Sequence, residues 1–255
     1  MDILQWILEA SAATNDPTQL EPYRIGHRIM LLNFNLVQGG SIPFSTVLSD
    51  ICNGPHASST LSRLRDEAAS VLGASSSSTT QPWDRATISK LVLADSAIRE
   101  SMRWSDFGLF ALPRRVSSAQ GITLDDGVKI PRGVHVEIPM HGIHMDETFH
   151  KDAASFQPFR FADGTLTAAR SAVTLDESFL GFGYGRNACP GRFFGMHVLK
   201  VVLAYFVLNY DVEFGDEMPP MKNIWEYRIP REDTALRIRR RESLSSLNIS
   251  NHATE

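Results

Sequence analysis

The chain has 255 residues, 43% of them hydrophobic and 21% charged, so it can bury the core of one large domain or of two small ones. Its net charge of −4 gives no positive field to attract a nucleic acid, and its two cysteines cannot form a disulfide framework, which favours a reducing compartment. The sequence predicts neither a membrane span nor a signal peptide, because no apolar stretch is long enough and residues 1–12 lack a basic start.

The first part of the chain has the apolar spacing of helices. The second helix is long and apolar, and Gly39, Gly40 and Pro43 are expected to loosen or kink it. Loops are predicted at residues 14–20 and at the serine-rich residues 73–81. The predicted helices cover residues 2–13, 23–50, 57–72 and 85–104.

The second part of the chain has fewer helical patterns. Short β-type runs separated by turn residues predict a small antiparallel sheet over residues 112–139, followed by irregular structure over 140–180. An apolar helix is expected to begin at Pro190, and hairpin strands are expected over 212–239. The fold class predicted is therefore mainly α with a small antiparallel β portion.

The most distinctive motif is FGYGRNACPG at residues 182–191, where Cys189 stands between a glycine-rich loop and an apolar helix. The first amide groups of that helix can stabilise a thiolate, and glycines such as Gly185 and Gly191 let the backbone approach a flat cofactor. Phe182 would keep water from the sulfur. A buried structural cysteine is the ordinary alternative, and a catalytic nucleophile is disfavoured because no histidine motif accompanies the cysteine.

This pattern, Phe-x-x-Gly-x-x-x-Cys-x-Gly, resembles the haem-ligand loop of cytochrome P450 monooxygenases. The resemblance implies that Cys189 is the axial ligand of a haem b iron and that its electron donation weakens the bound O–O bond. Residues 113–116 resemble the strand whose arginine meets a haem propionate, a role for which Arg114 is favoured over Arg115. Phe182, Gly185 and Gly191 would complete the cofactor site.

A second motif is Glu100-Ser-Met-Arg103, whose charged side chains lie one helical turn apart and can pair. By itself such a pair is usually a surface feature. In this context it resembles the Glu-x-x-Arg of the family, and Arg160 in the run PFRF resembles the arginine that joins it. The resemblance implies a buried network that locks the core. His141 and His144 lack metal-ligand spacing, so polar or capping roles are expected for them.

The chain departs from the family pattern in two ways. Where most members carry an acid or amide beside a threonine for proton delivery, it has Gln38, Gly39, Gly40 and Ser41, and none of these side chains titrates. The resemblance also covers only the carboxyl-terminal half of a usual P450. We therefore expect a partial haem domain over residues 1–241 and a disordered tail over 242–255.

Three functions are compatible with these patterns. The first is a haem-thiolate monooxygenase of secondary metabolism that oxidises an apolar small molecule, such as a terpenoid or polyketide, with electrons from NADPH through a separate reductase. Substrate contacts would come from residues 36–41, 106–112 and 227–229. Because the acid–threonine pair is missing, a haem-thiolate rearrangement that needs no external oxygen is also compatible with the sequence. The second is a truncated, non-catalytic chain with weak or no haem binding. A metal-free interaction module is the third. The expected location is the cytoplasm or the surface of the endoplasmic reticulum.

Overall fold

The computed structural model describes residues 2–53, 56–73, 83–162, 171–214, 221–229 and 235–241. The chain divides into two compact units, residues 1–44 and 45–255, and the boundary lies inside helix α2 (Pro22–Cys52). The sequence predicted a single haem domain over residues 1–241. The serine-rich loop, apart from Gly73, and the tail over 242–255 lie outside the described residues.

The first unit contains α1 (Ile3–Ala12) and the beginning of α2, as the sequence predicted, and a short 3-10 helix (Pro17–Leu20) within the predicted loop. Asp2 caps α1 by accepting a hydrogen bond from the backbone N–H of Gln5 at 2.9 Å. Arg28 of α2 donates to the hydroxyl of Ser11 and to the backbone carbonyl of Gln19. Local hydrogen bonds therefore connect the three helical segments of this unit.

Helix α2 is not interrupted at Gly39, Gly40 and Pro43, and its helical hydrogen-bond pattern runs through all three residues. A proline ring normally clashes with the carbonyl of the residue four positions earlier. For Pro43 that residue is Gly39, whose backbone can shift more freely than that of any other residue type. The glycine can therefore accommodate the proline ring, and the helix ends at Cys52, two residues after the predicted end.

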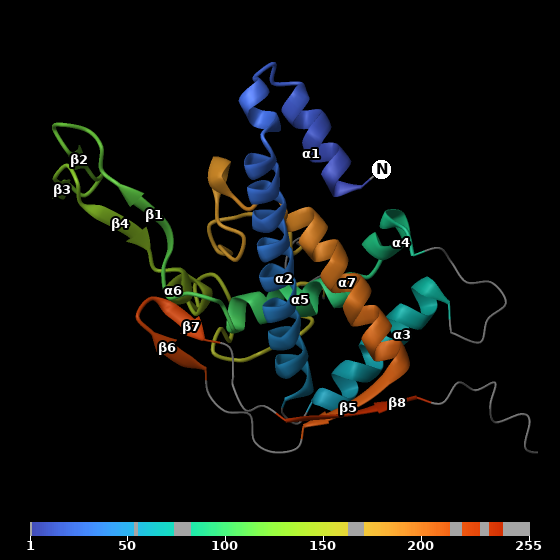
Figure 1. Ribbon diagram of the computed structural model, residues 1–255. Coiled ribbons are helices and arrows are strands. Elements are labelled where there is room, and N and C mark those ends of the chain that lie inside the picture. The colour runs from blue at the N-terminus through green and yellow to red at the C-terminus, as the bar shows by residue number, and fades with distance from the viewer. Residues whose placement is uncertain are drawn as a thin grey trace, which may run out of the picture. The chain divides into compact units, whose positions relative to one another are not determined.

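The second unit is built around four helices: α3 (Ala57–Leu72), α4 (Arg85–Ser89), α5 (Val92–Trp104) and α7 (Arg192–Asn209). Helix α7 packs against the other three, as Figure 1 shows for α3. Buried apolar side chains such as Leu64, Ile98 and Leu203 form the core between them. The carboxyl-terminal end of α2 adds Val47, Leu48 and Ile51.

The prediction of one helix over residues 85–104 was wrong, since α4 and α5 are separate helices. Leu91 has a non-helical backbone and precedes the first residue of α5. The carboxylate of Glu67, on α3, accepts hydrogen bonds from the backbone N–H groups of Leu93 and Ala94 at 2.6 and 3.0 Å. A side chain from another helix thus caps a new helix start at this position.

The strands form four two-stranded antiparallel sheets within the described residues, which confirms the predicted antiparallel hairpins. The short helix α6 (Met140–His144) and a 3-10 turn (Gly185–Asn187) lie among largely irregular residues between β4 and α7. The mainly helical fold class is also confirmed. The strand pairs are β1 (Ala111–Arg115) with β4 (His135–Ile138), β2 (Ile122–Thr123) with β3 (Lys129–Ile130), β5 (Tyr210–Phe214) with β8 (Leu236–Arg240), and β6 (Lys222–Ile224) with β7 (Tyr227–Ile229).

Helix α7 differs from its prediction in two respects. It begins at Arg192, with Gly191 at the preceding position, rather than at Pro190. Within the described part of the chain, it is also the one helix long and apolar enough to cross a membrane, with 18 residues and a mean hydropathy of 1.3. The expectation of no such stretch was therefore wrong. Because α7 buries Met196, Leu199 and Leu203 against its neighbours, we interpret it as a core helix.

Candidate functional site

The loop before α7 folds back on itself and leaves Cys189 exposed. The backbone N–H of Cys189 donates to the carbonyl of Phe182 at 2.8 Å, and the N–H of Gly183 donates to the carbonyl of Leu180 at 2.8 Å. Ala188 donates in the same way to Gly185 at 3.2 Å. These bonds hold both sides of the loop together, so the sulfur is presented by an ordered segment and not by a loose one.

Two glycines of this loop are required by backbone conformation. Gly183 and Gly185 have φ angles of +74° and +65°, a region that side-chain-bearing residues rarely adopt. No described atom lies within 4 Å of the position that a Cβ at Gly185 would take. At Gly191 a Cβ would lie 3.9 Å from the sulfur of Cys189, which is an ordinary contact. The space around Gly185 is therefore open, and Phe182, which begins the motif, is half-buried.

The two cysteines differ in their chemical environment. Burial raises the pKa of the Cys52 thiol to about 12, so that group stays protonated and cannot act as an anionic ligand at neutral pH. Cys189 lies just before α7, and the guanidinium of Arg192 donates to its backbone carbonyl at 2.9 Å. The sulfur of Cys189 is thus exposed at a position just before α7, and an exposed cysteine sulfur is a donor that fits a haem iron.

Glu100 lies fully buried between two arginines. Its Oε1 and Oε2 accept hydrogen bonds from Nη2 and Nε of Arg103, both at 2.8 Å, and from Nε of Arg160 at 3.1 and 3.0 Å. Oε1 also accepts from the backbone N–H of Gln157 at 2.8 Å. The carboxylate is thus fully surrounded by donors, which is the condition under which a buried charge is tolerated.

The remaining N–H groups of the two arginines bind backbone carbonyls. Arg103 donates to His144 at 2.6 Å and to Ala153 at 2.9 Å, and Arg160 donates to Ser155 at 2.8 Å and to Lys151. These carbonyls belong to the end of α6 and to the irregular stretch that follows it. The structure therefore brings Glu100, Arg103 and Arg160 together, and the network ties α5 to a stretch that has little secondary structure of its own.

The other predicted residues lie on the surface. Arg114 and Arg115 are both exposed on β1, and Arg114 donates to the carbonyl of Pro113, so the geometry does not separate their roles. In the first unit Gln38 and Ser41 are exposed, and the Ser41 hydroxyl donates to the Val37 carbonyl at 2.7 Å. This bond to its own helix is a common use of a serine hydroxyl in a helix.

Two of the three predicted substrate segments lie side by side. The backbone N–H of Leu109 donates to the carbonyl of Glu226 at 2.7 Å, and the N–H of Arg228 donates to the carbonyl of Phe107 at 3.0 Å. A bridge between Gly108 and Tyr227 lies between these bonds. Residues 106–112 and the hairpin β6–β7 therefore form one continuous edge, which sequence spacing alone could not show.

Sequence reasoning missed a polar cluster around the buried Asp106. Its Oδ2 lies 3.1 Å from Nδ1 of both His141 and His144, and its Oδ1 accepts from Arg228 at 2.8 Å. Burial alone would raise the pKa of this carboxyl, but hydrogen bonds from the two histidines outweigh it and the pKa lies below its usual value. Among the described residues, no three His, Cys, Asp or Glu side chains are arranged to hold a metal ion.

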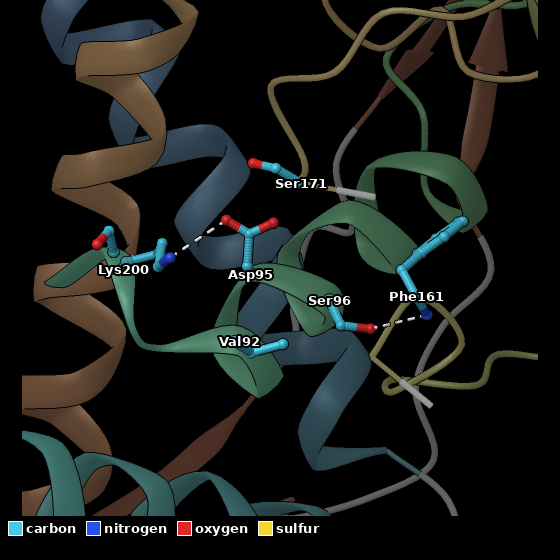
Figure 2. A pocket seen from close by; sticks show the side chains of 7 residues that line it. Val92, Asp95, Ser96, Phe161, Ser171 and Lys200 are labelled. Atoms are coloured by element: carbon cyan, nitrogen blue, oxygen red, sulfur yellow. Dashed lines mark hydrogen bonds and ion pairs between the residues drawn. The ribbon is translucent and has the colours of Figure 1, made fainter. Parts of the chain in front are cut away.

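A pocket whose lining does not include Cys189 lies between α5 and α7 (Figure 2). Lys200 and Asp95 pair across it at 3.2 Å, and Asp95 also accepts from the backbone of Ala172 at 2.6 Å. Ser96 accepts from the backbone of Phe161 at 3.0 Å. Because these polar groups already bind one another, we interpret the pocket as part of the packing of the core and not as a binding site. Its lining is Ser89, Val92, Asp95, Ser96, Phe161, Ser171 and Lys200.

Comparison with known proteins agrees with this geometry. The family model "Cytochrome P450" matches residues 1–236, and the chain therefore belongs to the cytochrome P450 family. It is 38% identical over 230 residues to cytochrome P450 monooxygenase gloP of Glarea lozoyensis, covering 84% of this chain and 41% of that protein. It is 36% identical over 226 residues to cytochrome P450 monooxygenase htyF of Aspergillus rugulosus, covering 83% and 32%.

A solved structure shows the same fold. The crystal structure of a cytochrome P450 (CYP102L1) superposes with a TM-score of 0.65 at 22% sequence identity and covers 86% of this chain and 46% of that one. The chain thus spans less than half the length of each of these three proteins. Membership in the family implies haem as the cofactor.

Proposed function

We propose that this chain forms the haem-binding half of a cytochrome P450 monooxygenase, with Cys189 as the axial thiolate ligand. The observation that carries the proposal is the exposed Cys189 on a hydrogen-bonded loop at the start of α7. Cys52 is unsuited to this role because burial raises its thiol pKa to about 12. The buried Glu100 network supports the proposal, since it orders the stretch that precedes the loop in the chain.

The chain's own residues would hold the cofactor from several sides. Cys189 would bind the iron, Gly185 and Gly191 would leave room for the macrocycle, Phe182 would limit water near the sulfur, and Arg114 would bind a propionate. When bound, haem with a thiolate ligand supplies the chemistry that cleaves O–O bonds. NADPH would provide electrons through a separate reductase. The substrate would be an apolar small molecule of secondary metabolism, and within the second unit it would contact residues 106–112 and 227–229.

The names of the relatives support oxygen insertion, because both gloP and htyF are described as monooxygenases. For the location we propose the cytoplasm or the surface of the endoplasmic reticulum. Binding at that membrane would require contacts other than α7, because this helix buries Met196, Leu199 and Leu203 against its neighbours.

The test is the spectrum of the purified chain after loading with haem, reduction and addition of carbon monoxide. We expect a Soret band at the position typical of a thiolate ligand. Cys189→Ser should remove that band, because a hydroxyl does not replace a thiolate at neutral pH. Cys52→Ser is the matched control and should keep the band, since Cys52 lies in the core on α2. Persistence of the band in Cys189→Ser would show that another group binds the iron.

A second candidate, a non-catalytic chain with weak or no haem binding, is favoured by the residues of α2. No carboxylate occurs between Glu21 and Asp50, and Ser41 donates its hydroxyl proton to its own helix. The same carbon monoxide spectrum of the haem-loaded chain separates the two candidates. Absence of haem uptake, or a band typical of a neutral ligand in the wild-type chain, supports the second candidate and contradicts the first.

A further inference from the structure

We infer that His144 is a positioning residue for the cysteine loop and that it acts through the backbone of Leu180. His144 is the last residue of α6 and is fully buried. Its Nε2 lies 3.0 Å from the backbone nitrogen of Leu180, and its Nδ1 lies 3.1 Å from Oδ2 of Asp106. The inference rests on the proposed function only in taking haem iron as the ligand of the loop. The hydrogen bonds of His144 do not depend on that proposal.

The hydrogen-bond partners determine the protonation of the ring. A backbone N–H can only donate, so Nε2 of His144 must be the unprotonated acceptor for Leu180. The proton of the neutral ring is then on Nδ1, which donates it to the carboxylate of Asp106. Asp106 is held in turn by Arg228 through its other oxygen. Asp106 thus selects the one tautomer of His144 that can bind the Leu180 amide.

From Leu180 the connection continues into the loop. The carbonyl of Leu180 accepts from the N–H of Gly183, so Leu180 is fixed through both of its backbone polar groups. Phe182 lies between Leu180 and Gly183 in the chain, and its carbonyl accepts a hydrogen bond from the N–H of Cys189. A short series of hydrogen bonds therefore runs from a buried carboxylate to the amide of the proposed ligand. Displacement of Leu180 would displace the acceptor of that amide as well.

The ring of His144 also supports the loop by packing. It stacks on Phe179 with ring centroids 5.6 Å apart and an interplanar angle of 21°. A Cβ at Gly181 would come within 2.9 Å of the edge of the Phe179 ring, so the start of the loop rests directly on that ring. Packing and hydrogen bonding are separable, because phenylalanine at position 144 would keep a ring for stacking and lose the acceptor for Leu180.

The chain offers a matched control in His150. This histidine is also buried and also binds the segment before the loop, since its Nε2 donates to the carbonyl of Ser178 at 2.9 Å. Ser178 lies two residues before Leu180. In the described structure the ring of His150 makes no hydrogen bond to the loop itself. His150→Phe therefore removes the bond to Ser178, whereas His144→Phe removes the bond to Leu180 together with the bond to Asp106. The inference predicts different consequences of the two changes for the cysteine loop.

The experiment is amide hydrogen exchange on the full chain without haem. His144→Phe should speed exchange at Leu180, Gly183 and Cys189 by about tenfold, the effect of losing one buried hydrogen bond, while His150→Phe should change these amides by less than about twofold. His144→Gln, whose side-chain oxygen can replace Nε2, should restore most of the protection. It also keeps the test decisive if His144→Phe fails to fold.

A second readout uses the haem-loaded protein. His144→Phe should shift the carbon monoxide complex from the thiolate-type band toward the neutral-ligand band, and His144→Gln should shift it less. Equal loop exchange in the two phenylalanine variants, or no rescue by glutamine, would overturn the inference. If the wild-type chain takes up no haem but the exchange pattern holds, the proposed function fails and the positioning role of His144 stands.

Discussion

The first part of α2 and helix α5 distribute apolar and charged side chains in opposite ways. On α2, Tyr23, Met30 and Phe34 are exposed by 81%, 64% and 63%, whereas on α5 the charged Arg99 and Glu100 are fully buried. The buried charges are tolerated because each has hydrogen-bonding partners at close distance. The exposed apolar side chains on α2 contribute no hydrophobic stabilisation in this structure, because their surface is not removed from water. The contrast shows that stability in this chain follows from satisfied partners, not from the polarity of the residues alone.

The largest effect is expected from removing the shared partner of two buried arginines. Glu100→Ala leaves the guanidinium groups of Arg103 and Arg160 without a carboxylate, so the free energy of unfolding should fall by about 3–5 kcal/mol. Urea unfolding followed by circular dichroism measures this change. Glu21→Ala is the control, because its pair with Arg24 is exposed and should contribute about 0–1 kcal/mol. Equal losses in the two variants would contradict the contrast.

The next effect concerns Arg99, whose guanidinium lies 4.0 Å from the ring centroid of Phe179 and 4.7 Å from that of Phe161. Arg99 also binds Asp176 at 3.0 Å and the carbonyl of Ser171 at 2.8 Å. Arg99→Met should lower the free energy of unfolding by about 2–4 kcal/mol, since charged and stacking contacts are lost together.

Arg99→Lys tests whether the planar fork of the arginine matters. It keeps the charge but not the fork, so its loss in urea unfolding should be smaller than that of Arg99→Met. A loss in Arg99→Lys as large as that in Arg99→Met would show that the planar group is the essential feature.

A pH-dependent effect is expected from His150. Burial lowers the pKa of this ring from its usual 6.5 to about 4 in the folded state. Between these values the unfolded chain binds a proton that the folded chain does not, so stability falls as the pH decreases from 6.5 toward 4. The contribution is at most about 1.4 kcal/mol per pH unit.

The measurement is the unfolding free energy at several pH values for the wild type and His150→Phe. The difference between the two proteins should change in this window and be flat above pH 6.5, because the ring is then neutral in both states. Parallel curves throughout would mean that His150 titrates normally in the folded protein.

The smallest effect is expected on α2. Phe34→Gln replaces an exposed apolar ring, so the free energy of unfolding should change by no more than about 0.5 kcal/mol, while self-association should decrease. Urea unfolding and light scattering report the two quantities. A loss of stability above about 2 kcal/mol would mean that Phe34 is buried in solution, and the contrast between the helices would no longer hold.

The sequence predicted what depends on local pattern and on fixed spacing. Helix 57–72 matches the structure in both bounds because its amphipathic period is followed by Gly73. The Cys189 loop and the pairing of Glu100 with Arg103 were predicted from short motifs. Arg160 lies sixty positions from Glu100 and was found only through the resemblance to the family.

Features that depend on distant partners were not predicted. The break between α4 and α5 depends on Glu67, which lies twenty-six positions before Leu93. The role of His144 depends on a backbone group thirty-six positions away, and backbone donors carry no sequence signal.

The unequal burial of the two cysteines has a practical consequence. Cys52 is enclosed in the core and its thiol stays protonated, whereas Cys189 is open to reagents. A maleimide dye should therefore label the native chain at one position without prior mutagenesis. Since that position is the atom proposed to meet the iron, dye and porphyrin would compete for it, and the decrease in labelling after haem loading would measure the fraction of molecules whose sulfur is bound.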